Sequence, residues 1–209
     1  MNILLAFTAF IFAYILGSIP TAVWAGMIFR GIDLREHGSG NAGAANAIRV
    51  LGWKIGLPVL IIDMSKGWLA AMLPVFFSLA DPGTALITNL QIGTGLTAIL
   101  GHIFPVFARF RGGKGVATAS GVILAIHPLL TLSCFGVFLI VLLITRIVSV
   151  SSMSAGIAFP ILLFALFDTP SLMFKLFSIL VAVALFVTHR ENIKRLLKGE
   201  EKKFFGKKS

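Results

Sequence analysis

Residues 1–29 read MNILLAFTAFIFAYILGSIPTAVWAGMIF and contain no charged side chain. At about 1.5 Å of rise per residue, a helix of this length is ample to cross a hydrocarbon core of roughly 30 Å. A cleaved secretory signal has a positive start, a shorter apolar run and a small-residue cleavage site. Because the first charge is Arg30, the stretch predicts a retained first transmembrane helix.

The composition of the whole chain is also that of a membrane protein. Of its 209 residues, 57% are hydrophobic and 12% are charged, and the mean hydropathy is +0.98. A soluble domain has about 25% charged residues, so half of that charge is missing. The net charge of +10 reflects the preference of Lys and Arg for the cytoplasmic side of membrane proteins, and we expect no nucleic-acid partner. Cys134 is the single cysteine, which excludes an internal disulfide.

Fifteen of the eighteen Lys and Arg residues lie in three clusters, at 30–54, 109–114 and 190–208. The connections at 81–83 and 168–170 carry only acidic charge. The excess of positive charge in cytoplasmic loops therefore places the clusters inside and the N-terminus outside. Hydrophobic runs predict helices over residues 3–29, 55–80, 84–108, 116–145, 147–167 and 171–188.

Six plain helices would leave the C-terminal tail on the wrong side. The run 116–145 must therefore cross twice, and His127-Pro128 breaks it into two short helices or a re-entrant hairpin. We expect an all-α integral membrane protein of about seven transmembrane helices, with the N-terminus outside and the C-terminus cytoplasmic. It would form one polytopic domain over 1–209, with cytoplasmic motif segments at 30–54, 109–115 and 189–209. The basic tail from 202 to 209 would lie against anionic lipid headgroups.

The segment 37–52, HGSGNAGAANAIRVLG, has the ingredients of an anion site. Its GxGxxG pattern follows a transmembrane helix rather than a strand, so it fails the context of a dinucleotide fingerprint. Glycines still let backbone N–H groups converge on an anion at a helix N-terminus. Ser39 adds a hydroxyl, and Asn41 and Asn46 add amides that could bind a ligand. Arg49 adds a planar guanidinium group that suits phosphate. A flexible surface loop with Ser and Asn as helix caps is an equally good interpretation of this segment alone.

The segment 109–115, RFRGGKG, resembles a P-loop. It lacks the GxxxxGK[ST] spacing and the hydroxyl for magnesium, so we do not expect ATP hydrolysis. Lys114, flanked by glycines, can deliver a point charge to a phosphate. Arg109 and Arg111 are interpreted as ordinary positive-inside residues.

The third segment leaves the last helix as THRENIKRLLKGEE, residues 188–201. His189 and Asn192 are three residues apart and should share a helical face, with Arg190 elsewhere. Asp63 and Lys66 have the same spacing inside a predicted span and are interpreted as a structural ion pair that supports the loops. No Ser-His-Asp, Cys-His or HxxxxD pattern and no His/Asp/Glu metal cluster stands out, so we expect no metal and no cofactor.

These segments, together with the GSIP of residues 17–20 and the DMSKG of residues 63–67, resemble the bacterial acyl-phosphate:glycerol-3-phosphate acyltransferases, the PlsY family. The resemblance covers the whole chain in order and spacing. GSGNAGAAN, GGKGVA and HREN together are specific. Two departures are Ala45, where the family pattern has threonine, and Thr188, where a basic residue is frequent.

The resemblance implies a seven-helix enzyme in the bacterial cytoplasmic membrane, with its site facing the cytoplasm. It would move an acyl chain from acyl phosphate to the 1-hydroxyl of glycerol 3-phosphate and give lysophosphatidic acid, an early step of phospholipid synthesis. Membrane lipid is the surrounding partner, and no obligate protein partner is expected. The implied substrate-binding residues are Ser39, Asn41, Arg49, Lys114, His189 and Asn192, and Ser39, Lys114 and His189 are the implied catalytic ones.

Two other classes compete with this interpretation. A transporter of phosphate or an organic phosphate would also have basic glycine loops, but transporters place their sites near the midplane on broken helices, usually within inverted repeats. A lipid phosphatase or phosphotransferase normally needs a histidine nucleophile or an aspartate-bound metal, and neither is visible. Acyl transfer in detergent without metal would distinguish the acyltransferase from both.

Overall fold

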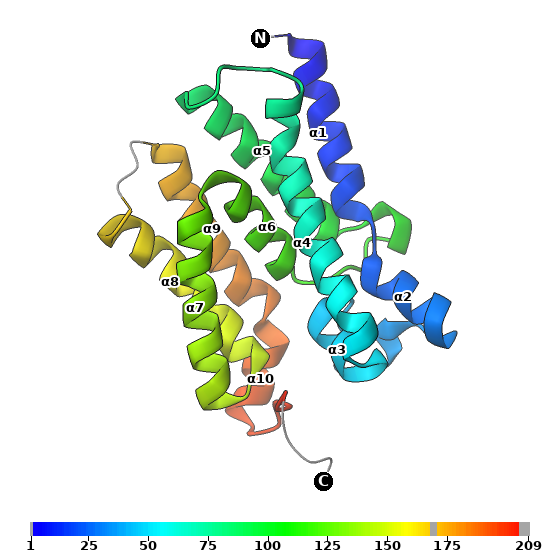
Figure 1. The fold of residues 1–209 in the computed structure, drawn as a ribbon. Coiled ribbons are helices and arrows are strands. Elements are labelled where there is room, and N and C mark those ends of the chain that lie inside the picture. Colours follow the sequence, from blue (N-terminus) through cyan, green and yellow to red (C-terminus); the bar gives the residue numbers. More distant parts are fainter. Residues whose placement is uncertain (1, 168–170, 205–209) are drawn as a thin grey trace. The chain divides into compact units, whose positions relative to one another are not determined.

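The computed structural model describes residues 2–167 and 171–204. The chain forms two compact units, Met1–His127 and Pro128–Ser209. In the described residues every regular element is a helix and no strand occurs (Figure 1). The all-α prediction is therefore confirmed for this part of the chain. A single domain over residues 1–209 stays a prediction.

The first unit is built on three long helices and one shorter helix, α6, which pack in the pairs α1–α5, α4–α5, α1–α4 and α4–α6. Small residues allow the backbones to approach closely, as is common between membrane helices. A Cβ at Gly17 would collide with the Ala98 carbonyl, and one at Gly121 with the Met64 carbonyl. The elements of this unit are α1 (Ile3–Ser18), α2 (Thr21–Arg30), η1 (Leu34–Glu36), α3 (Ala44–Leu51), α4 (Trp53–Phe76), α5 (Ala85–Ile103), η2 (Val106–Ala108) and α6 (Val116–Ile126).

Proline divides the first apolar run. One continuous helix over 3–29 was expected, but α1 ends at Ser18 and α2 begins at Thr21. Pro20 has no backbone N–H and disfavours the helical conformation in the residue before it. Ile19 is accordingly extended, with φ −61° and ψ 110°. The two helices together still form a candidate span over Ile3–Arg30.

The run 116–145 is also divided by proline, as expected at His127-Pro128. The outcome is two helices of unequal length, the 11-residue α6 and the 18-residue α7 (Pro128–Thr145). Eleven residues rise only about 16 Å, roughly half of a hydrocarbon core. Helix α6 is thus shorter than a full span, whereas α7 is long enough for one.

Five helical stretches are long and apolar enough to cross a membrane in the described residues. They are Ile3–Arg30, Trp53–Phe76, Ala85–Ala108, Pro128–Thr145 and Val148–Ala165. A sixth is obtained if Leu172–Thr188 and Arg190–Leu197, which meet at 57°, count as one bent span. Seven spans, and the sides on which the termini lie, stay predictions.

The second unit consists of α7, α8 (Val148–Ala165), α9 (Leu172–Thr188) and α10 (Arg190–Leu197) in its described residues. Helix α8 packs against both α7 and α9. Phe159 of α8 meets Phe174 and Phe177 of α9 edge to face, with ring centroids 5.8 and 6.0 Å away. The outer connection expected at 168–170 and the tail from 205 to 209 lie outside the described residues.

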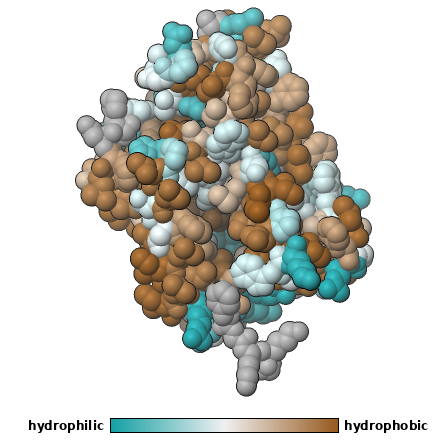
Figure 2. Space-filling view, viewed as in Figure 1, coloured by the Kyte–Doolittle hydropathy of each residue, from teal (hydrophilic) through white to brown (hydrophobic). Residues whose placement is uncertain are grey.

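Both units expose large hydrophobic side chains. Ile28 of α2 is 75% exposed, and Leu143 and Ile144 near the end of α7 are 74% and 76% exposed. Figure 2 shows hydrophobic atoms over most of the visible face. Soluble monomers rarely expose apolar surface to this extent. The surface therefore agrees with a protein embedded in lipid.

Candidate functional site

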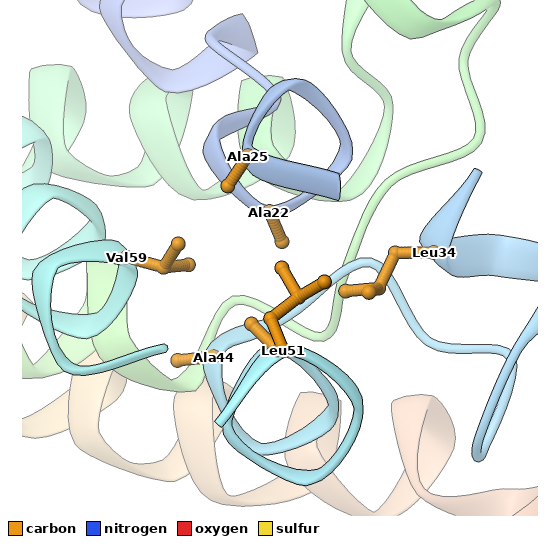
Figure 3. Close-up of a cluster of buried hydrophobic side chains, with 7 residues drawn as sticks. Ala22, Ala25, Leu34, Ala44, Leu51 and Val59 are labelled. Carbon is orange, nitrogen blue, oxygen red and sulfur yellow. The ribbon is translucent and has the colours of Figure 1, made fainter. Parts of the chain in front are cut away.

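A small apolar core anchors the first glycine segment to the neighbouring helices (Figure 3). Its buried side chains come from α2, η1, α3 and α4 and are Ala22, Ala25, Leu34, Ala44, Ala47, Leu51 and Val59. Leu34 lies just before the segment and Leu51 at the end of α3, so both ends of the segment are anchored. Full burial of a leucine side chain is worth roughly 1.5–3 kcal/mol. The loop between these anchors therefore has fixed ends.

Asn46 organises this loop from within. Its side chain is buried, with the residue 1% exposed, and its Oδ1 accepts the backbone N–H of Ser39 at 2.8 Å. Its Nδ2 donates to the carbonyls of Leu34, His37 and Asn41 at 2.9–3.0 Å. An amide has two N–H donors and one carbonyl acceptor, so these contacts use the whole group. Asn46, which we considered as a ligand-binding amide, instead holds the shape of the loop.

Two glycines allow the loop to wrap around that amide. Gly38 and Gly40 have φ of +66° and +72°, the left-handed region that other L-residues adopt at a cost. A Cβ at Gly38 would also collide with Oδ1 of Asn46. The backbone therefore favours glycine at both positions. The N–H of Gly40 donates to the His37 carbonyl at 3.0 Å, which places Ser39 within a turn.

The second glycine segment folds back on the end of α5. The N–H of Gly112 donates to the Ile103 carbonyl at 3.1 Å, and the N–H of Gly113 donates to the His102 carbonyl at 3.2 Å. A Cβ at Gly112 would collide with the His102 carbonyl, and one at Gly113 with Nε2 of the His102 ring. Only glycine permits this approach, so the paired glycines before Lys114 have a steric reason.

Arg35, which the sequence did not single out, joins the two segments. Its Nη1 donates to the carbonyls of Ala108 and Arg111 at 2.9 and 3.4 Å, while its Nη2 and Nε bind the carboxylate of Asp33, the nearest atoms being 2.6 Å apart. The hydrogen bond from Arg35 lowers the pKa of Asp33 below its ordinary 3.8, against the opposing effect of burial. The pair is therefore ionised at neutral pH and fastens the first segment to the second.

The predicted site residues of the first unit lie on these two segments. A Cβ at Gly113 would come 3.1 Å from the carbonyl oxygen of Ala42, so the backbones touch immediately beside Asn41 and Lys114. The four predicted residues are half-buried: Ser39, Asn41, Arg49 and Lys114. The two arginines of the second segment are exposed. This contrast fits the distinction made between Lys114 and those arginines, and the roles themselves stay predictions.

In the second unit, His189 lies at the junction of α9 and α10. Its Nδ1 is 2.8 Å from the carbonyl of Leu185. Because a carbonyl can only accept, Nδ1 bears the hydrogen, and Nε2 has the lone pair when the ring is neutral. His189 and Asn192 are 3% and 7% exposed, whereas the side chain of Arg190 is 70% exposed. The predicted separation of Arg190 from the other two is confirmed.

Glu201 is the second residue that the sequence did not reveal. Its Oε1 accepts hydrogen bonds from Asn192 and from Oγ of Ser149, the latter at 2.7 Å, and its Oε2 accepts from Nε of Arg195 at 2.7 Å. Burial raises the pKa of Glu201, but these hydrogen bonds outweigh it and hold the pKa below 4.5. The carboxylate thereby fixes Asn192 and ties α8 to the end of α10. Two adjacent acids, Glu200 and Glu201, in an otherwise basic tail were the available signal.

The buried ion pair predicted between Asp63 and Lys66 is confirmed. Lys66 Nζ lies 2.8 Å from Asp63 Oδ1, and the two residues are 3% and 1% exposed. Thr21 Oγ1 donates to the same carboxylate oxygen at 3.0 Å, and Lys66 also donates to the Ile19 carbonyl at 2.9 Å. The pair therefore braces the break between α1 and α2. His102 approaches it from α5, with Nδ1 3.7 Å from Asp63 Oδ1.

Within residues 2–167 and 171–204, no three His, Cys, Asp or Glu side chains gather as a metal-binding group would require. The glycine segments carry the cations Arg49 and Lys114 together with the hydroxyl of Ser39 and the amide of Asn41. Such a set suits a phosphate or carboxylate better than a metal ion.

Comparison with known proteins agrees with this chemistry. The model of the glycerol-3-phosphate acyltransferase family matches residues 7–199. The glycerol-3-phosphate acyltransferase of Chlorobaculum parvum is 43% identical over 222 residues, covering 94% of this chain and 96% of that protein. Its counterpart from Chlorobaculum tepidum is 45% identical, with the same coverage.

Two solved structures are similar over nearly the whole chain. The glycerol 3-phosphate form of PlsY, an integral membrane glycerol 3-phosphate acyltransferase, is 40% identical, has a TM-score of 0.82 and is matched over 96% of each chain. Its lysophosphatidic acid form is 39% identical with a TM-score of 0.81, matched over 96% of this chain and 95% of that one. The transporter and phosphatase alternatives find no support in these matches. The chain belongs to the glycerol-3-phosphate acyltransferase family, and the solved structures that it resembles are those of an integral membrane enzyme.

Proposed function

We propose that this enzyme transfers a fatty acyl chain from acyl phosphate to the 1-hydroxyl of glycerol 3-phosphate and releases lysophosphatidic acid and phosphate. The observation that carries the proposal is the fastening of two glycine segments to each other by Arg35, beside half-buried Ser39, Arg49 and Lys114. Both substrates carry phosphate, so a cradle of backbone N–H groups and cations suits each of them.

Each side chain has a proposed role in that cradle. Arg49 would hold the phosphate of glycerol 3-phosphate through its planar fork, and Lys114 would add a compact positive charge. Ser39 and Asn41 would orient the glycerol hydroxyls by hydrogen bonds. His189 and Asn192 are proposed as further substrate-binding residues, with Asn192 oriented by Glu201. Orientation of two bound reactants can supply up to about 7–11 kcal/mol of the barrier.

The chemical step needs no protein nucleophile, because acyl phosphate is already activated. The 1-hydroxyl oxygen bonds to the acyl carbonyl carbon, and the carbon–oxygen bond to phosphate breaks with its electron pair on the departing phosphate. Lys114 would stabilise the charge that develops on the carbonyl oxygen and the phosphate. The hydroxyl proton passes either to His189 or to a substrate phosphate. The tautomer imposed by Leu185 makes Nε2 the accepting nitrogen of His189.

The membrane setting follows from the charge distribution. We propose that the basic segments 30–54, 109–115 and 189–209 lie on the cytoplasmic side of a bacterial inner membrane, because Lys and Arg concentrate there. Glycerol 3-phosphate would then arrive from the cytoplasm, and the acyl phosphate, with its long apolar chain, from the lipid bilayer. No metal, cofactor or obligate protein partner forms part of the proposal.

Acyl transfer by the purified protein tests the proposal directly. The protein in detergent with EDTA is given palmitoyl phosphate and radiolabelled glycerol 3-phosphate, and label is followed into lysophosphatidic acid. We expect product with palmitoyl phosphate and none with palmitoyl-CoA. Absence of product from a folded sample, or equal use of palmitoyl-CoA, would contradict the proposed donor.

Two matched substitutions test the assigned residues. Lys114→Ala should lower kcat/KM by about 100-fold or more, as expected for loss of a cation at developing charge. Arg111→Ala removes an exposed cation from the same loop and should cost far less. His189→Gln separates the two proton acceptors: near-normal turnover would assign the proton to a substrate phosphate, and a large loss would favour His189. Equal losses for Lys114→Ala and Arg111→Ala would refute the role of Lys114.

A further inference from the structure

His102 forms the floor beneath the second glycine segment. The residue is 6% exposed and lies in the last turn of α5. Its carbonyl accepts the N–H of Gly113 at 3.2 Å, and its ring stands against the Cα of that glycine. A Cβ at Gly113 would collide with Nε2 and come 3.2 Å from Cε1. Both the backbone and the ring of His102 therefore determine where Gly113, the residue before Lys114, can lie.

The buried ion pair lies on the other side of this ring. Nδ1 of His102 is 3.7 Å from Oδ1 of Asp63, which is too long for a hydrogen bond, so the ring packs against the pair without bonding to it. The same oxygen of Asp63 binds Lys66 and Thr21. Buried charges inside a membrane protein are costly and are normally paired or functional. Lys66 in turn binds the carbonyl of Ile19 at the break between α1 and α2. The ring of His102 therefore lies between the buried cluster around Asp63 and the loop at Gly113, which has no side chain.

We propose that His102 is a positioning residue: its ring, packed between the Asp63–Lys66 pair and the loop, sets the course of the backbone at Gly113 and thereby the direction of the Lys114 ammonium. The proposal rests on the substrate-binding role of Lys114 proposed above. A small shift of the loop would leave the lysine charged but misaligned with the substrate phosphate. Misplacement by about 1 Å can cost about 100-fold in rate even when no reacting group is lost.

A double-mutant cycle tests the contact between the ring and the glycine. Gly113→Ala adds a methyl group that collides with Nε2, and it should lower kcat/KM for glycerol 3-phosphate by about 10-fold or more, as overpacking does. His102→Ser removes the ring and should cost several-fold. The double variant should be more active than Gly113→Ala alone, because the collision has been removed. Rescue would be partial, since the Ala42 carbonyl also lies 3.1 Å from the added Cβ.

A control glycine separates this coupling from general destabilisation. Gly136 in α7 has no atom within 4 Å of a built Cβ, so Gly136→Ala adds the same methyl group without a collision. Its effect should simply multiply with that of His102→Ser. Losses that multiply in the Gly113 cycle as they do in the Gly136 cycle would overturn the proposed contact.

A second readout does not depend on activity. Arg109 and Arg111 are exposed and offer trypsin two sites in the same loop. We expect faster cleavage there in Gly113→Ala than in wild type, and slower cleavage again in the double variant. Replacing the ion pair with neutral isosteres, Asp63→Asn with Lys66→Met, should also speed cleavage because the ring loses its support. Unchanged cleavage in all these variants would overturn the proposal.

The two readouts separate the two proposals. If wild type transfers no acyl chain but the trypsin cycle shows coupling, the positioning of the loop stands and the proposed function fails. If wild type is active and the double variant is no better than Gly113→Ala in either readout, the function stands and the positioning role of His102 is refuted.

Discussion

Asn46→Ala is the sharpest test of how the first glycine segment is built. The substitution removes the acceptor of the Ser39 N–H and the donors to three loop carbonyls. A buried donor left without a partner costs about 1–3 kcal/mol, and each lost hydrogen bond to a neutral carbonyl costs about 0.5–1.5 kcal/mol. With one acceptor and two N–H donors lost, the first unit should be destabilised by about 2–6 kcal/mol.

The chain contains its own reporters for this measurement. Its three tryptophans, Trp24, Trp53 and Trp68, all lie in the first unit, so intrinsic fluorescence during heating reports that unit. For chains of this size, 1 kcal/mol corresponds to about 2–4 °C in Tm. Asn46→Ala should therefore lower the fluorescence-detected Tm by at least about 4 °C in detergent.

Two further variants make the outcome decisive. Asn89→Ala removes the same amide from an exposed position on α5 and should leave Tm nearly unchanged. Asn46→Asp keeps an acceptor for Ser39 but places a carboxylate against three carbonyls, so it should destabilise at least as much as alanine. A Tm for Asn46→Ala equal to that of Asn89→Ala would show that the loop does not depend on this side chain.

Two other predictions concern the carboxylates that brace the segments. Because the folded pKa of Asp33 lies below its ordinary 3.8, its pair with Arg35 contributes full stability above that pH and loses it as pH falls through the folded pKa. The tryptophan-detected Tm should therefore fall more steeply below pH 3.8 in wild type than in Asp33→Asn; parallel curves would contradict this pairing. Glu201→Gln removes the charge that three neighbouring groups bind, which should loosen the packing of the second unit. The half-buried Cys134 of that unit should then react faster with a maleimide. An unchanged rate would argue against Glu201 as the brace of the second unit.

The sequence predicted those features that depend on local composition. The uncharged first stretch, the long apolar runs and the three basic segments each follow from neighbouring residues, and the structure has helices at all of those runs. The Asp63–Lys66 pair was predictable because one helical turn separates its members. The break at Pro20 was the main local error, although proline itself was the available signal.

Side-chain roles within the site were not predictable in the same way. Asn46 looks like a ligand-binding amide in the sequence, yet its side chain binds backbone groups in and next to the loop. Arg35 looks like one more positive-inside residue, yet it reaches a carbonyl 73 positions away. Glu201 looks like part of a charged tail, yet it accepts a bond from a serine 52 positions earlier.

The sequence by itself determined that this is a helical membrane protein with phosphate-suited segments, because hydropathy, charge and glycine spacing act over a few residues at a time. Only the tertiary structure decided which polar groups support the loops. Their roles depend on hydrogen bonds and steric contacts between distant parts of the chain, such as His102 against Gly113. Such contacts form only when helices pack closely enough for a single Cβ to matter.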